Sequence, residues 1–250
     1  MPDARMAEAP ARSTGALSRQ VLNVQNLEAW YGESHILHGV NFSVNSGEVV
    51  TLLGRNGAGK TTTLKSIMGI IGKRTGSIRF GESEIIRTSS DRIARMGIAF
   101  CPEERGIFAS LDVEENLLLP PTVRPGGLAV PTIFELFPNL RERLRSQGTK
   151  LSGGEQQMLA IARILRTGAR LLLLDEPTEG LAPVIIEQIG RTIARLKAEG
   201  FTILLVEQNF RFAATVADRH YVVDRGKAID MIPNAQLEAN MGKLHEYLGV

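Results

Sequence analysis

The chain has 250 residues, 43% hydrophobic and 22% charged, so it is long enough to bury one full hydrophobic core. Its 29 basic and 27 acidic residues are interspersed and give a formal net charge of only +2, which argues against nucleic acid as a partner. The single cysteine, Cys101, excludes an internal disulfide, fits a reducing cytosol and is expected to be a small buried hydrophobe.

Residues 1–20 mix Pro, Arg and Ala without the continuous apolar core that a signal peptide requires, and we expect them to form a disordered tail. No later stretch approaches the roughly 18 to 20 uninterrupted apolar residues that cross a bilayer. We therefore expect one main domain over residues 21–250, with any membrane role supplied through a partner.

Two kinds of strand are predicted. Near the start, Val40, Phe42 and Val44 alternate with polar residues, and Leu22 and Val24 hint at a second strand, which is typical of a half-exposed antiparallel sheet. Three later runs are nearly continuous in apolar residues, as in parallel strands covered on both faces: 48–54, 171–176 and 201–207.

Helices are predicted after these runs. One helix face is formed by apolar residues at i, i+3, i+4 and i+7, namely Leu64, Ile67, Met68 and Ile71. A second helix begins at Pro183 and ends at Glu199, before Gly200. Strand and helix in alternation indicate an α/β fold with a parallel sheet.

The middle of the chain, about 104–150, contains helix-breaking Pro and Gly residues between short helical segments. This pattern predicts a small helical lobe inserted between sheet strands. Four of its apolar side chains either line a docking groove for a membrane partner or pack the lobe itself: Leu118, Leu119, Phe134 and Phe137.

The motif GRNGAGKT fits G-x-x-x-x-G-K-[ST] and lies between an apolar strand and an amphipathic helix. Its glycines let backbone N–H groups face a phosphate at a helix N-terminus. Lys60 is expected to reach the β and γ phosphates and Thr61 to bind Mg²⁺. The candidate phosphate-binding residues are Gly54, Arg55, Asn56, Gly57, Ala58, Gly59, Lys60, Thr61 and Thr62.

Two carboxylates follow the run LLLL. Asp175 and Glu176 stand at the C-terminal end of a predicted parallel strand, where α/β sheets bind ligands. Behind a phosphate-binding loop, Asp175 is expected to hold Mg²⁺ through water, and Glu176 to polarise the attacking water.

The motif LSGGEQQ begins a helix with a capping box formed by Ser152 and Glu155. Gly153 and Gly154 in the first turn cost roughly 1 kcal/mol each relative to Ala. The alternative is a capped surface helix, which needs nothing more than the cap. The cost of the two glycines instead fits a backbone that approaches a phosphate closely.

The order of GRNGAGKT, LSGG and LLLLDEP resembles the ATP-binding subunit of ABC transporters over roughly residues 21–235. The resemblance implies a RecA-like P-loop NTPase core with a parallel central sheet, an N-terminal antiparallel β subdomain and an inserted α-helical lobe. It implies ATP and Mg²⁺ as ligands, and a head-to-tail dimer in which residues 152–155 complete the site of the opposite subunit. It also implies that Tyr31 stacks on adenine, with Trp30 as the rival.

Longer stretches, among them YGESHILHGVNFSV, DEPTEGLAP and LLVEQN, are similar to the smaller ATPase of branched-chain amino acid importers. That similarity implies a bacterial importer with integral-membrane permeases and, indirectly, a periplasmic substrate-binding protein. This chain would lie on the cytoplasmic face of the inner membrane. Urea or amide importers are close relatives, and dimerisation with itself or with a sister ATPase stays open.

Three positions depart from the common pattern of the family. The loop glutamine that contacts Mg²⁺ and water aligns with Glu103, or in another register with Glu104, and a loop aspartate aligns with Ala182. The switch histidine aligns with Gln208, whose neutral amide lacks the charge that histidine can carry. Glu103, Glu176 and Gln208 are the candidate catalytic residues, and Glu103 is also a candidate metal ligand.

The rival function is a non-transport ABC ATPase acting on DNA or ribosomes. The resemblance implies that such proteins carry a long coiled coil before LSGG, or two cassettes, and this chain has no sustained heptads and one cassette. A P-loop kinase or GTPase would not need LSGGEQQ. Ordinary surface or core roles are expected for His35, His38, His220 and His245.

Overall fold

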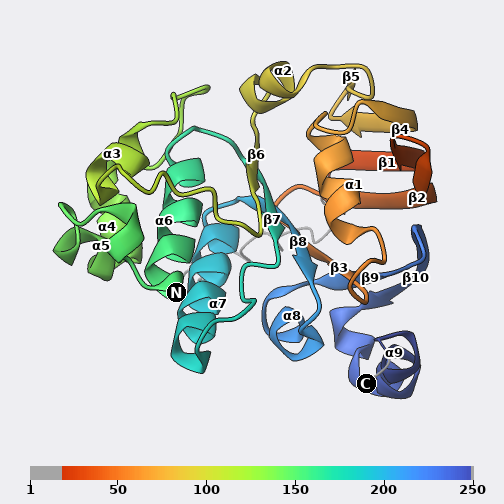
Figure 1. Cartoon of the computed structure of the whole chain (residues 1–250). Helices are drawn as coiled ribbons and strands as arrows, with labels where there is room; N and C mark the ends of the chain where they lie inside the picture. The colour runs from red at the N-terminus through yellow and green to blue at the C-terminus, as the bar shows by residue number, and fades with distance from the viewer. Residues whose placement is uncertain (1–18, 249–250) are drawn as a thin grey trace, which may run out of the picture.

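The computed structural model describes residues 19–248, coloured in Figure 1. The expected tail therefore lies almost wholly outside the described residues, and Gln20 already belongs to the first strand. Two sheets organise the described part of the chain, one antiparallel and one mainly parallel.

The antiparallel sheet has the strand order β2-β1-β4-β5. Its strands are β1 (Gln20–Tyr31), β2 (Ser34–Asn45), β4 (Lys73–Phe80) and β5 (Ser83–Glu84). The predicted alternation is confirmed, because Val40, Phe42 and Val44 are buried while Asn41 between them is exposed. This sheet is the N-terminal β subdomain that the sequence predicts.

The central sheet has the strand order β10-β9-β3-β8-β7-β6, parallel except for β10 at one edge. Its strands are β3 (Val49–Leu53), β6 (Ile98–Cys101), β7 (Leu171–Asp175), β8 (Thr202–Glu207), β9 (Arg219–Asp224) and β10 (Lys227–Pro233). The three apolar runs became β3, β7 and β8, and every residue of these three strands is buried.

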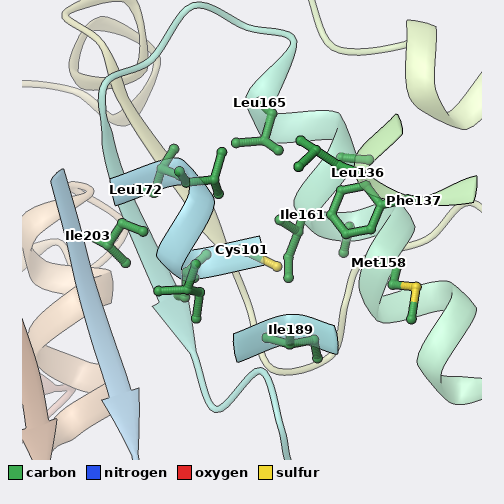
Figure 2. Packing of buried hydrophobic residues seen from close by; sticks show 14 of the residues in the cluster. Cys101, Leu136, Phe137, Met158, Ile161, Leu165, Leu172, Ile189 and Ile203 are labelled. Carbon is green, nitrogen blue, oxygen red and sulfur yellow. The ribbon is translucent and has the colours of Figure 1, made fainter. Parts of the chain in front are cut away.

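Successive residues of β7 pack into two different hydrophobic clusters, which explains its unbroken apolar run. Leu172 and Leu174 face a cluster with the helical lobe, whereas Leu171 and Leu173 face one with the antiparallel sheet. Figure 2 shows the first cluster, where Leu172 and Ile203 from the sheet face Ile161 and Leu165 of α6. The sheet is therefore covered on both faces, as predicted.

The helices lie on both sides of the central sheet, with α3 to α6 gathered at the side away from the antiparallel sheet (Figure 1). They are α1 (Lys60–Ile67), α2 (Ser90–Arg95), α3 (Val113–Leu118), α4 (Val130–Leu136), α5 (Pro138–Glu142), α6 (Gly153–Leu165), α7 (Pro183–Ala198), α8 (Phe210–Val216) and α9 (Met241–Leu248). Three short 3₁₀ turns complete the described chain, at Gly148–Lys150, Asn234–Gln236 and Glu238–Asn240.

One predicted helix is shorter than expected. Helix α1 ends at Ile67, with Met68 as its C-cap and Gly69 at a left-handed φ of 72°, so Ile71 is buried outside the helix. The predicted helix after β7 is confirmed, as α7 spans Pro183–Ala198.

The four lobe residues differ in burial. Phe137 is fully buried and Phe134 packs against the same cluster, so these two side chains hold the lobe together. Leu118 and Leu119 are instead 46% and 50% exposed.

Candidate active site

The loop between β3 and α1 curls because its glycines take positions that other residues could not. A Cβ at Gly54 would lie 2.3 Å from the carbonyl oxygen of Val223, and a Cβ at Gly59 would lie 2.8 Å from the side chain of Leu37. Gly59 is the N-cap of α1 at φ 104°, and no side chain caps the helix. The first turn of α1 is therefore open to an anion.

Lys60 is held inside this loop. Its Nζ donates to the carbonyl oxygens of Gly54 at 2.8 Å and Arg55 at 3.2 Å, and lies 3.0 Å from Oε1 of Glu176. The two charged side chains are only 3% and 9% exposed. In this arrangement Glu176 supplies the negative charge that a buried lysine requires.

Asp175, the last residue of β7, contacts the start of α1 next to Lys60. Its Oδ1 accepts a hydrogen bond from Thr61 Oγ1 at 3.0 Å, whereas its Oδ2 is buried without a partner. Burial raises the pKa of Asp175 to about 6, and the negative charges of Glu176 and Glu103 act in the same direction. A buried carboxylate with a free oxygen marks a place where a cation would be stabilised.

These groups open into a pocket of about 410 Å³. Its lining includes nine residues expected from the sequence: Tyr31, Asn56, Gly57, Gly59, Lys60, Thr61, Thr62, Glu103 and Glu176. Glu103 rather than Glu104 lines the pocket, which agrees with the preferred register. Ile36 and Glu179 also line the pocket and were not predicted. Glu179 could have been found, because it is a third acidic residue close after Asp175 and Glu176 in the motif DEPTE.

The two aromatic candidates are separated by the structure. Tyr31 lines the pocket and is 48% exposed, so its side chain is accessible to a ligand there. Trp30 stacks on His35, with ring centroids 4.4 Å apart and planes at 13°, and Lys73 lies over its ring. Trp30 does not line the pocket.

The LSGG segment forms the expected capping box: Ser152 accepts from the backbone N–H of Glu155, and Glu155 accepts from that of Ser152 at 2.7 Å. A Cβ at Gly154 would lie 3.0 Å from side-chain carbons of Ile185, so packing against α7 also requires this glycine. None of residues 152–155 lines the pocket. A single chain therefore does not bring its two glycine motifs together.

The polar residues at the end of β8 and in the turn after it have different environments. Gln208 is exposed and does not line the pocket. Glu207 is 2% exposed and accepts a hydrogen bond from Thr178 Oγ1 at 2.8 Å; burial raises its pKa to about 7. Asn209 caps α8 by accepting from the N–H of Phe212 at 3.1 Å. Ala182, at the N-cap of α7, offers no side-chain cap.

Residues 37–179 match the family model described as ABC transporter. The chain is 42% identical to the high-affinity branched-chain amino acid transport ATP-binding protein BraG of Pseudomonas aeruginosa, over 92% of this chain and 100% of that protein. It is 37% identical to the lipopolysaccharide export system ATP-binding protein LptB of Escherichia coli K12, over 83% and 88% of the two chains.

Solved structures resemble the fold closely. A nucleotide-free ATP-binding cassette from an ABC transporter superposes with a TM-score of 0.80 at 25% identity, covering 92% of this chain and 99% of that one. A dimeric bacterial ABC transporter cassette gives a TM-score of 0.74 at 25% identity, covering 85% and 98%.

Proposed function

The chain belongs to the ABC transporter family and is an ATPase whose hydrolysis of ATP is coupled to transport, and we propose that it powers an importer of branched-chain or other hydrophobic amino acids. The observation that carries this proposal is the 42% identity to BraG over that protein's whole length. LptB, at 37% over 88% of its length, makes lipopolysaccharide export the second candidate. An importer of urea or amides and a non-transport ABC ATPase are the remaining alternatives.

The geometry of the pocket supports separate roles for its residues in binding the phosphates and the adenine of ATP. The open first turn of α1 and Lys60 bind the β and γ phosphates, and Tyr31 stacks on the adenine. A γ-phosphate competes with Glu176 for Lys60, since both are anions within reach of one ammonium group. ATP therefore releases the Glu176 carboxylate to accept a proton from the attacking water.

The residues at Asp175 fit a Mg²⁺ ion. Thr61 offers a hydroxyl, Asp175 a buried oxygen without a partner, and Glu103 a carboxylate in the pocket lining. Within residues 19–248 no cluster of three or more His, Cys, Asp or Glu side chains is arranged to hold a metal on its own. A Mg²⁺ ion held by these residues would need further oxygen ligands, which phosphate and water could supply. The chemistry such an ion would supply is neutralisation of charge on the phosphates.

ABC cassettes dimerise and associate with membrane-spanning transporter domains, and a dimeric cassette shares this fold. We propose a head-to-tail dimer, with a second copy or a sister ATPase, in which Ser152, Gly153, Gly154 and Glu155 face the nucleotide of the opposite subunit. The support is that residues 152–155 do not line the pocket of their own chain. In that dimer Gln208 positions the γ-phosphate and water through neutral contacts.

No helix among the described residues is long and apolar enough to cross a bilayer. We propose that integral-membrane permeases hold this chain at the cytoplasmic face of a bacterial inner membrane. Leu118 and Leu119, exposed on the lobe, are the proposed contact. A periplasmic substrate-binding protein acts indirectly, through the permeases.

Reconstitution of the complex in liposomes tests the transported substrate. The chain is purified with its permeases and second ATPase, and ATP hydrolysis is measured with the associated binding protein alone or loaded with leucine, isoleucine, valine or urea. Stimulation by the branched-chain amino acids supports the proposal. Stimulation only by urea, or co-purification with lipopolysaccharide and no response to amino acids, contradicts it.

A further inference from the structure

We infer that Glu207 is a positioning residue for the proposed ATPase reaction, joining the loop that carries Glu176 to the turn that carries Gln208. This role rests on the proposed function, because it concerns how the two candidate catalytic side chains are held relative to each other. Neither Glu207 nor its partner Thr178 lines the nucleotide pocket, so both would act through their neighbours.

The Glu207 carboxyl group contacts two separate segments of chain. Thr178, in the loop after β7, donates from Oγ1 to Glu207 Oε1 at 2.8 Å. Asn209, in the turn after β8, has its backbone N–H 3.4 Å from Glu207 Oε2. Glu207 and Thr178 are 2% and 5% exposed, so neither can exchange this contact for water without moving. Each of the two carboxyl oxygens therefore holds one of the two loops.

The loop after β7 depends on this anchor because Glu176 has an unusual backbone. Its φ is +44°, a left-handed conformation that costs a non-glycine residue free energy unless its surroundings hold it there. Its N–H donates to the carbonyl of Val206 at 3.0 Å, and its own carbonyl accepts from Glu179 at 3.2 Å. Thr178 lies inside that turn, so its link to Glu207 fixes the direction of the Glu176 side chain toward Lys60.

The turn after β8 is held on both sides of Gln208. Glu207 precedes it and is buried, while Asn209 follows it and caps α8 through Phe212. The Gln208 side chain itself is exposed, so its position is set by its backbone and by these two neighbours. A shift of Thr178 would therefore move the backbone at Gln208, because the buried carboxyl group of Glu207 contacts both segments.

A carboxyl at this position is not what packing alone favours. Residues 201–206 before it are buried, five of them apolar, and Glu207 ends the same strand. Burying a carboxyl group is unfavourable unless its oxygens are satisfied, and a hydrocarbon side chain would carry no such cost. The two contacts to different loops give a physical reason for the carboxyl group.

The test uses the full-length chain with the variants Thr178→Val, Thr178→Ser, Glu207→Leu and the Val/Leu double variant. The control is Thr192→Val, because Thr192 is also buried but its hydroxyl bonds only the carbonyl of Gln188 in its own helix. For each variant we would measure ATP affinity, kcat, KM and backbone hydrogen exchange.

A misplaced catalytic group costs between about tenfold and a hundredfold in rate. Thr178→Val is expected to lower kcat by at least about tenfold with nucleotide affinity within about twofold, and Thr178→Ser to restore it. The double variant is expected to match Glu207→Leu, because once the carboxyl group is removed the Thr178 hydroxyl has no contact with it left to lose. Hydrogen exchange in Thr178→Val should rise at 208–212 as well as at 177–181.

Three results would overturn the inference: equal losses in the control and Thr178→Val, additive effects in the double variant, or exchange that rises only at 177–181. Failure of the proposed function would look different. A wild-type chain that neither binds nor hydrolyses ATP would contradict that function, while the exchange data on Thr178→Val would still decide whether the two loops are linked.

Discussion

Lys60 Nζ lies 3.0 Å from Glu176 Oε1, joining the first residue of α1 to the residue that follows β7. The lysine that would bind the γ-phosphate thus holds the carboxylate that would activate water. In this structure the two charges neutralise each other, and in the proposed mechanism ATP separates them before hydrolysis.

Glu176→Gln should separate nucleotide binding from hydrolysis. The amide oxygen still accepts from Lys60, so ATP affinity is expected to stay within about threefold, whereas loss of the base should lower kcat by at least about a hundredfold. Phosphate release and fluorescent-nucleotide titration measure the two quantities. The matched control is Glu187→Gln, on the exposed side of α7. Hydrolysis at the wild-type rate would exclude Glu176 as the base.

Asp175→Asn should have opposite effects with and without Mg²⁺. Removing a buried carboxylate whose Oδ2 has no partner is expected to raise the Tm in EDTA. With Mg²⁺ and ATP the wild type is expected to gain more stability than the variant, because the asparagine amide oxygen is a weaker ligand. Thermal unfolding under both conditions gives the comparison. A variant that gains as much from Mg²⁺ and ATP would show that Asp175 does not hold the ion.

Tyr31→Ala and Trp30→Ala form a paired test of the adenine contact. Loss of a stacking ring costs about 1 to 3 kcal/mol, so Tyr31→Ala should weaken ATP binding between about fivefold and a hundredfold. Trp30 is stacked on His35, and its replacement should change affinity less than about twofold. Equilibrium titration with ATP and with a triphosphate lacking a base distinguishes the contributions. The reverse order of effects would assign the stack to Trp30.

Glu207 should make the protein less stable as pH rises toward neutrality. Burial raises its pKa in the folded chain from an ordinary 4.5 to about 7, so the folded state binds the proton more tightly than the unfolded state. The free energy of unfolding therefore loses up to about 3 kcal/mol from this group as pH rises through that window.

Glu207→Gln cannot titrate, so its stability relative to the wild type should increase between about pH 4.5 and about pH 7. Urea unfolding across this range measures the difference. The control is Glu199→Gln, whose carboxyl pairs with Arg195 on the surface of α7. Curves for Glu207→Gln and wild type that run parallel would show that burial does not perturb Glu207.

Much of the fold was predictable because local patterns and tertiary packing agree. The apolar runs of β3, β7 and β8 have no polar face, so only a sheet covered on both sides suits them. Helix α1 shows where periodicity misleads: Ile71 keeps the spacing of a helix face, yet the left-handed Gly69 ends the helix first.

The parts of the candidate site that lie within one sequence motif could be predicted. Contacts between residues far apart in the sequence could not. GRNGAGKT places Lys60 and Thr61 together within one loop and helix. The hydrogen bond between Thr178 and Glu207 joins residues 29 apart, and no local pattern encodes it. Gly154 has a packing partner in Ile185 that its motif does not reveal.

Cys101 has a practical consequence. It is the single thiol of the chain, it is 1% exposed, and burial raises its pKa to about 12. The thiolate is the nucleophile that attacks thiol-reactive reagents, so burial and the raised pKa protect the native side chain from labelling in the folded protein. A cysteine introduced on the surface, for example at Leu118, would carry a fluorophore alone, and docking could be followed without first removing the natural residue.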